Sequence, residues 1–213
     1  MQIRTLIFDL DGTIQDPSIG IANSANFALR HFDYETVDMQ RITPCIGPPL
    51  EEVFLSLVGE LPEDRLMQLI GKYRERYAET GYAECSLYDG VRDTIRDLSS
   101  SGHDLKICTS KRLDFAVRIL ELHGLASAFS DVSGGDVGVR KSDQLARMIE
   151  GGLDPRHSVM IGDRAVDIHA ARANAMASVG VLWGFGALPE IESARPDYIV
   201  SEPRELVSLF CDV

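Results

Sequence analysis

The chain near its amino terminus reads IRTLIFDLDGTIQ over residues 3–15, a short apolar strand that runs into a Gly-Thr turn. Asp9 and Asp11 stand where this strand ends. Side chains at positions i and i+2 of a strand share a face, so the two carboxylates can converge on one substrate. Open α/β sheets bind their ligands at the carboxyl ends of the strands. The placement favours phosphoryl-transfer chemistry at this strand end.

Length and composition predict a globular protein with one main domain and a smaller insertion. The 213 residues are 45% hydrophobic and 25% charged, and the mean hydropathy of −0.03 is ordinary for such chains. No run approaches the ~18 apolar residues of a transmembrane helix, and Asp9 lies where a signal peptide would be apolar. We therefore expect a cytoplasmic protein without a membrane partner.

The net charge limits the classes of partner, and the spacing of the cysteines argues against a cysteine metal site. A formal net charge of −12 opposes a broad surface for a nucleic acid polymer or an anionic membrane. The four cysteines show no CxxC spacing and no histidine partner at metal-ligand spacing. We expect reduced thiols without a catalytic role.

Alternation of helical and strand patterns predicts the fold. Short apolar strands are expected at Leu105–Cys108, Ser158–Ile161, Ser178–Leu182 and Tyr198–Val200, with helical segments between them. This order is typical of an α/β protein with a parallel sheet between two layers of helices. The first strand joins that sheet, so residues 1–15 and 84–213 form the predicted core domain.

Residues 16–83 form the predicted insertion, a helical block without a convincing strand. Two stretches carry apolar side chains at helical spacing: Ile21, Ala25, Ala28, Leu29 and Phe32, then Leu66, Leu69, Ile70, Tyr73 and Tyr77. Between them, IGPPL over residues 46–50 predicts a turn that opens another helix. The block is expected to cap the site.

The segment Thr109-Ser110-Lys111 is predicted to follow the strand Leu105–Cys108 directly and to precede an amphipathic helix from Leu113 onward. A hydroxyl and free backbone N–H groups at a helix start can bind an anion, although Thr and Ser cap ordinary helices equally well. Lys111 is expected at the surface.

Lys141 lies near the start of a predicted helix that carries Leu145, Met148 and Ile149. Attack of a carboxylate on a phosphate dianion brings like charges together, so a cation must offset their repulsion. The chain has only four lysines, the last of which is Lys141. A compact ammonium at the site is one interpretation, and a solvated surface lysine is the other.

The sequence GDRAVD over residues 162–167 follows a predicted strand and contributes two more carboxylates. If Asp163 begins a helix, Asp163 and Asp167 share one helix face, although acidic residues also favour helix starts for dipole reasons. Together with Asp9, Asp163 would complete a hard oxygen site suited to Mg²⁺, with the backbone carbonyl of Asp11 as a further ligand.

These four segments resemble the motifs of the haloacid dehalogenase superfamily, and the helical block resembles its C1-type cap. The resemblance implies a nucleophile at Asp9, a general acid/base at Asp11, phosphate-holding groups at Thr109 and Lys141, and a metal ligand at Asp163. Asp167 would support the metal or act through water. Gly12, Thr13 and Ser110 would support the site. Arg140 could share the role of Lys141 or take it over, because the segment Gly134–Lys141 is shorter than the corresponding family loop.

More narrowly, the segments at Ile46–Leu50, Thr109–Lys111 and Gly184–Gly186 resemble the phosphoglycolate phosphatase-like branch, which includes 5′-nucleotidases. The cap would then read the leaving group. Gly47 and Pro48 are candidate substrate contacts, and Arg41 is either an anion contact or a surface residue.

The expected function is a Mg²⁺-dependent phosphatase that acts on a small phosphorylated metabolite through an aspartyl-phosphate intermediate, most closely like phosphoglycolate phosphatase. A 5′-nucleotidase, a sugar-phosphate phosphatase and a mutase remain alternatives. A dehalogenase is disfavoured, because a halide leaves without the proton that Asp11 would supply. Different classes are a phospho-accepting receiver domain, against which the helical insertion argues, and a non-catalytic interaction protein. We expect a monomer or a homodimer.

Overall fold

The computed structural model describes residues 3–46, 50–135 and 139–211. The chain forms two compact units, which we call the core unit, residues 1–15 and 87–213, and the inserted unit, residues 16–86. The sequence predicts that the insertion ends at residue 83. In the structure the inserted unit ends at Ser86, and the core unit resumes at Leu87.

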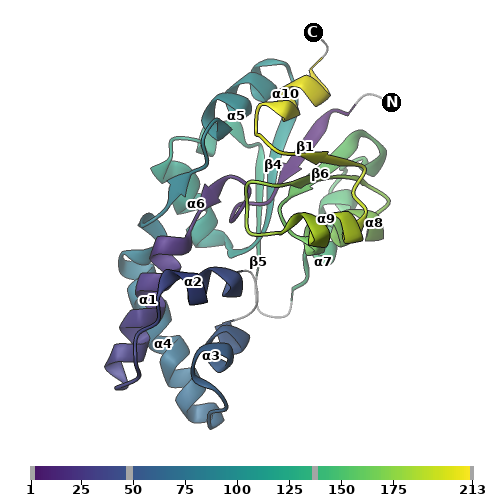
Figure 1. Ribbon diagram of the computed structural model, residues 1–213. Coiled ribbons are helices and arrows are strands. Elements are labelled where there is room, and N and C mark those ends of the chain that lie inside the picture. The colour runs from purple at the N-terminus through teal and green to yellow at the C-terminus, as the bar shows by residue number, and fades with distance from the viewer. Residues whose placement is uncertain (1–2, 47–49, 136–138, 212–213) are drawn as a thin grey trace. The chain divides into compact units, whose positions relative to one another are not determined.

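The core unit is built on a six-stranded sheet in the order β5-β4-β1-β6-β7-β8 (Figure 1). The strands are β1 (Thr5–Phe8), β4 (Asp104–Arg112), β5 (Asp131–Gly135), β6 (Ser158–Gly162), β7 (Ala177–Val181) and β8 (Tyr198–Val200). Every neighbouring pair is parallel. The predicted parallel-sheet α/β fold is confirmed.

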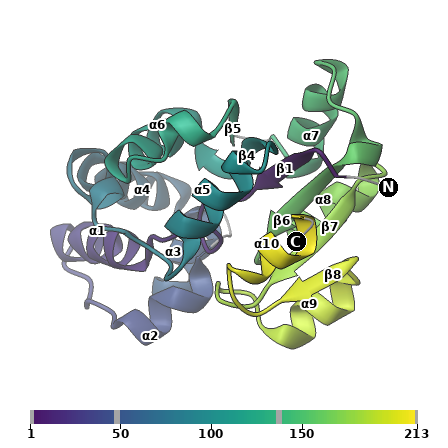
Figure 2. The same cartoon turned by 90° about the horizontal axis from the view of Figure 1, so that it is seen from above.

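Helices cover the sheet of the core unit (Figures 1 and 2). They are α5 (Val91–Ser100), α6 (Leu113–Leu122), α7 (Lys141–Glu150), α8 (Ala165–Ala173), α9 (Leu188–Ala194) and α10 (Glu205–Phe210). Helix α7 packs beside α8, and α10 packs beside α5. The helices predicted from Leu113 and near Lys141 are confirmed.

Strand β1 lies at the centre of the sheet, between β4 and β6. Leu6, Ile7 and Phe8 are all buried, so the strand is a continuous apolar run rather than an alternating one. That pattern is typical of a strand covered on both faces. Each such buried side chain contributes about 1.5–3 kcal/mol. This buried central strand thus fixes the position of Asp9, which directly follows it.

The inserted unit is helical, with α1 (Ser18–His31), α2 (Met39–Ile42), α3 (Leu50–Val58) and α4 (Glu63–Glu79). The helix predicted to follow the turn at residues 46–50 is confirmed as α3, and residues 47–49 of that turn lie outside the described residues. Helix α1 packs on α4, and a Cβ atom at Gly20 would lie 2.0 Å from the carbonyl oxygen of Gly81. A salt bridge between Arg76 and Glu84, with an N–O distance of 2.8 Å, also ties the end of α4 to the segment that follows it.

The sequence prediction missed three strands and ended a fourth one too early. Strand β5 was missed, since its Ser-Gly-Gly end has low strand propensity and its pairing with β4 supplies what the local sequence lacks. Strand β4 continues to Arg112 instead of ending at Cys108. Two short strands, β2 (Gln15–Asp16) and β3 (Ser86–Leu87), pair with each other at the ends of the predicted helical block.

Within the described ranges, the helices include none with both the length and the apolar character needed to cross a membrane. In the same part of the chain the cysteines form no disulfide bond.

Candidate active site

Asp9 directly follows β1 and lies at the carboxyl end of the sheet. Its backbone N–H donates to the carbonyl of Ile161 at 2.9 Å, so the pairing with β6 holds the residue in place. Its side chain is buried. After Asp11 the chain turns at Gly12, whose φ of +84° lies in the left-handed region that favours glycine.

Three carboxylates, those of Asp9, Asp163 and Asp167, meet in this buried region, with one oxygen of each within 4.8 Å of the others. Asp163 follows β6. Asp163 does not begin a helix, because α8 begins at Ala165, so the condition for a shared helix face is not met. Asp167 instead lies in the first turn of α8 and accepts a hydrogen bond from the Arg164 N–H at 3.1 Å. The turn brings the two acids together.

Lys141 supplies the cation of this cluster. Its Nζ lies 3.0 Å from Oδ1 of Asp9 and contacts Oδ1 of Asp167, and the residue is 3% exposed. Burial alone would lower the pKa of the ammonium, but the charges of Asp167 and Asp9 outweigh burial and hold that pKa above its usual range. The solvated-lysine interpretation is therefore wrong. Arg140, the alternative cation, is exposed and pairs with Asp143 at 3.3 Å.

Asp163 is held by the loops around it. Its Oδ2 accepts a hydrogen bond from the Phe185 N–H at 2.8 Å, and its Oδ1 lies 3.4 Å from the donating hydroxyl of Thr13. A Cβ atom at Gly12 would lie 2.2 Å from Oδ2 of Asp163, and one at Gly184 would lie 2.5 Å from it. Glycine at both positions lets the backbone approach the carboxylate.

The cluster carries an excess of negative charge. Burial, then the neighbouring charges of Asp9 and Asp167, raise the pKa of Asp163 to about 7. Among the described residues, Oδ1 of Asp9 has no hydrogen-bond partner, although Lys141 Nζ lies near it. Three buried carboxylates against one ammonium form a set of hard oxygen donors that fits a divalent cation.

Thr109 lies within β4 rather than at a helix start, so the predicted helix N-terminus at this segment is wrong. Helix α6 begins only at Leu113. Thr109 is buried, and its hydroxyl oxygen accepts a hydrogen bond from the Lys111 N–H at 3.2 Å. The hydroxyl thereby helps to shape the irregular end of the strand, while Ser110 is exposed.

Asp11 has two partners that sequence reasoning missed. Oδ2 of Asp11 lies 2.8 Å from Nζ of Lys111, whose side chain is only 8% exposed. Oδ1 accepts a hydrogen bond from the Gln15 amide at 2.5 Å. The expectation of a surface Lys111 is wrong. The position of Gln15, four residues after Asp11 in a buried turn, was the one signal that could have pointed to its role.

The remaining predicted contacts belong to the inserted unit and stay predictions. Arg41 is exposed and donates to the carbonyl of Leu57 at 3.3 Å. Gly47 and Pro48 lie outside the described residues.

Comparison with known proteins places the chain in a family. Residues 6–181 match the model of the haloacid dehalogenase-like hydrolases. A 5′-nucleotidase from Pseudomonas aeruginosa is 34% identical over 95% of this chain and 93% of its own length. A phosphoglycolate phosphatase from Vibrio parahaemolyticus is 28% identical over 97% and 96%. The tyrosine-protein kinase PtkA from Mycobacterium tuberculosis is 35% identical over 97% and 73%.

Solved structures show the same architecture. A putative phosphatase from Clostridium difficile superimposes with a TM-score of 0.91 at 29% identity, covering 99% of both chains. Because the family model spans most of the chain and the Pseudomonas relative matches nearly its whole length, this chain belongs to the haloacid dehalogenase-like hydrolase family.

Proposed function

We propose that this phosphatase is a Mg²⁺-dependent phosphomonoesterase in which Asp9 attacks phosphorus. The observation that carries the proposal is the buried convergence of Asp9, Asp163 and Asp167 with the Lys141 ammonium at one end of the sheet. A structural ion-pair cluster would balance its charges, whereas this one retains more carboxylates than cations.

The metal would be held by Asp9, Asp163 and the backbone carbonyl of Asp11. Asp167 would support these ligands indirectly, through its contact with the Lys141 ammonium. The fit rests on the carboxylate-rich donor set and on Oδ1 of Asp9, which accepts no hydrogen bond among the described residues and is paired only with the Lys141 ammonium. When bound, the cation supplies electrostatic compensation between the carboxylate and the phosphoryl group. Mg²⁺ suits such a site, because it prefers oxygen ligands and retains several waters.

The reaction proceeds in two displacements. A carboxylate oxygen of Asp9 forms a bond to phosphorus while the bond to the ester oxygen breaks, and protonated Asp11 gives its proton to the departing alkoxide. Asp11 then takes a proton from a water molecule whose oxygen forms a bond to phosphorus, while the bond between phosphorus and the Asp9 oxygen breaks. The products are the alcohol from the first displacement and inorganic phosphate from the second, and Asp9 returns to a free carboxylate.

Lys141 and Thr109 would hold the phosphoryl oxygens. The Lys141 ammonium already lies 3.0 Å from Asp9, so it can offset the repulsion between this carboxylate and an incoming dianion. Thr109 approaches from the neighbouring strand β4, which pairs with β1. Both groups contact only the end of the substrate that all phosphomonoesters share.

The substrate is most closely of the phosphoglycolate type, with a nucleoside monophosphate or a sugar phosphate as alternatives. Relatives named phosphoglycolate phosphatase and 5′-nucleotidase support this range. The inserted unit would act as a cap that excludes water and reads the leaving group.

A phosphate-release screen across phosphorylated metabolites, with Mg²⁺ and with a chelator, tests the proposal. We expect Mg²⁺-dependent turnover of at least one small phosphomonoester and its loss in Asp9→Asn. Equal turnover with the chelator would remove the metal from the proposal, and turnover by Asp9→Asn would remove the nucleophile.

A further inference from the structure

Gln144 is a buried side chain of α7 that reaches two strands of the sheet. Its amide Nε2 donates to the carbonyl of Thr109 at 3.1 Å, and its Oε1 accepts a hydrogen bond from the Ser133 hydroxyl at 3.0 Å. The residue is 2% exposed. A buried amide costs free energy unless it is hydrogen-bonded, so these contacts fix the side chain in one orientation.

The Thr109 carbonyl lies where regular strand pairing is interrupted. The register of β4 with β1 ends at Ile107, and its register with β5 shifts between Cys108 and Arg112. A buried carbonyl left by such an interruption needs another donor. The Gln144 amide supplies it, and so takes the place of a backbone partner at the strand end that presents Thr109.

Gln144 also lies three residues after Lys141 on the same helix. Positions i and i+3 of a helix are neighbours on its surface. One helix therefore carries both the ammonium that contacts Asp9 and the amide that binds Thr109.

We propose that Gln144 is a positioning residue that holds Thr109 at a fixed place relative to Lys141. The inference rests on the proposed function, in which these two residues bind the phosphoryl oxygens. Loss of the amide donor would loosen Thr109 without removing any group that touches the substrate. Phosphate affinity and turnover would both fall, whereas a residue that only stabilises the fold would change neither in folded protein.

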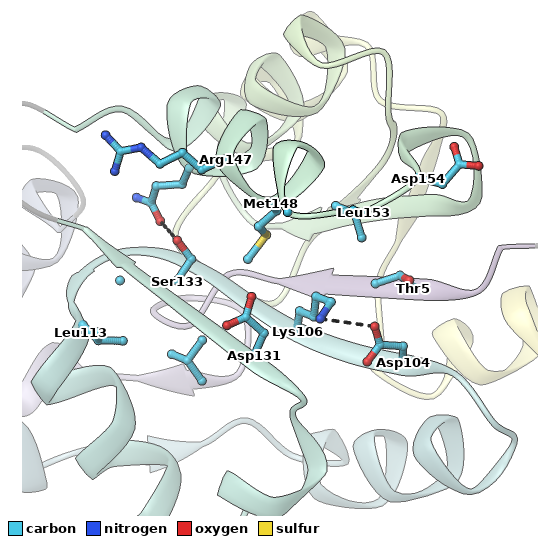
Figure 3. A pocket seen from close by; sticks show the side chains of 15 residues that line it. Thr5, Asp104, Lys106, Leu113, Asp131, Ser133, Arg147, Met148, Leu153 and Asp154 are labelled. Carbon is cyan, nitrogen blue, oxygen red and sulfur yellow. Dashed lines mark hydrogen bonds and ion pairs between the residues drawn. The ribbon is translucent and has the colours of Figure 1, made fainter.

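Ser133 provides the matched control. It lies on the wall of a cavity of about 590 Å³ that is lined in part by residues of β5 and α7 (Figure 3). Its hydroxyl contacts the amide oxygen of Gln144, whereas the Thr109 carbonyl contacts the amide nitrogen. Ser133→Ala removes the hydrogen bond to Oε1 and leaves the bond between Nε2 and Thr109 in place.

The test compares Gln144→Met, Gln144→Leu and Ser133→Ala in the full chain with Mg²⁺. Methionine keeps the length of the side chain without a donor, and leucine also lacks a donor and an ionisable group. For each variant we measure kcat and KM on a phosphomonoester, the Kd of inorganic phosphate by calorimetry, and the thermal midpoint. The second Gln144 variant preserves the test if the first does not fold.

We expect both Gln144 variants to lower kcat/KM about tenfold and to weaken phosphate binding about tenfold. A tenfold change corresponds to ~1.4 kcal/mol, which is the contribution of about one hydrogen bond. Ser133→Ala should stay within about twofold of the parent protein, well below that factor. Folded Gln144 variants with parental values, or an equal loss in Ser133→Ala, would overturn the inference. If the parent protein releases no phosphate from any ester, the proposed function fails, and the calorimetric Kd still decides the role of Gln144.

Discussion

Nζ of Lys111 lies 2.8 Å from Oδ2 of Asp11, and the Gln15 amide donates to the other oxygen of the same carboxylate. The proposed acid/base is therefore held from both sides, by β4 on one side and by its own turn on the other. A carboxylate fixed in this way is already oriented before substrate arrives, which is a condition for efficient proton transfer.

Lys111→Met should lower kcat about tenfold, since Asp11 loses a charge-assisted contact worth about 1.5–3 kcal/mol in favourable cases. Steady-state kinetics on the best substrate measures the effect. Lys72→Met is the matched control, because Lys72 pairs with Glu75 at the surface of the inserted unit. Equal kcat values for both variants would contradict a role for Lys111 at Asp11.

Asp11→Asn should reduce kcat by about a hundred- to ten-thousand-fold, the usual contribution of general acid/base catalysis. The amide can keep a contact with Gln15 but cannot transfer a proton. The loss should shrink for substrates whose leaving group is a weak base, because these depart without protonation. A loss below roughly tenfold on an alkyl phosphate would argue against the assignment.

Lys141→Met should destabilise the metal-free protein at neutral pH by about 3–5 kcal/mol, because it leaves buried carboxylates unpaired. The adjacent Arg140 offers a control, since its side chain is 82% exposed whereas that of Lys141 is 1% exposed. Arg140→Met should change the free energy of unfolding by less than about 0.5 kcal/mol. Chemical denaturation of both variants measures the difference, and similar losses would contradict the structure.

The metal-free protein should lose stability as pH rises from about 4 to about 7. Asp163 has a raised pKa of about 7 in the folded state, against an ordinary value of 3.8, so over this interval the folded state binds the extra proton. Each pKa unit corresponds to about 1.4 kcal/mol. Denaturation across this pH range measures the slope.

Asp163→Asn removes the titration of this carboxyl, so the free energy of unfolding should fall less steeply with pH than in the parent protein. Near pH 7 without metal, the variant should be more stable than the parent. Saturating Mg²⁺ should reverse the ranking, since the metal favours the ionised carboxylate of the parent. An unchanged slope in Asp163→Asn would show that another group dominates the titration.

The elements that the sequence predicted correctly are those with strong local patterns. The apolar run of β1, the carboxylates at its end and the amphipathic α7 each carry their own signal. Strand β5 does not, because its Gly134-Gly135 end depends on close approach to the backbone at Ser110 and Leu113. A Cβ atom at Gly135 would lie 2.3 Å from the Ser110 carbonyl oxygen. That requirement is tertiary and invisible to local propensity.

Among the side chains of the site, some positions follow from the local sequence pattern and others depend on tertiary structure. Asp9 and Asp163 follow strands, so their convergence could be expected from sheet geometry. The burial of Lys111 could not, since it depends on β4 continuing past Cys108 through an irregular pairing. Long side chains such as lysine reach partners that sequence spacing alone does not reveal.

The most direct test of the account is to find where the phosphoryl group resides during turnover. Protein quenched in acid during steady-state hydrolysis would be digested and analysed by mass spectrometry. We expect a phosphorylated peptide that contains Asp9, absent from Asp9→Asn, which should also lack turnover. A phosphoryl group on another residue, or parental turnover by Asp9→Asn, would contradict the mechanism.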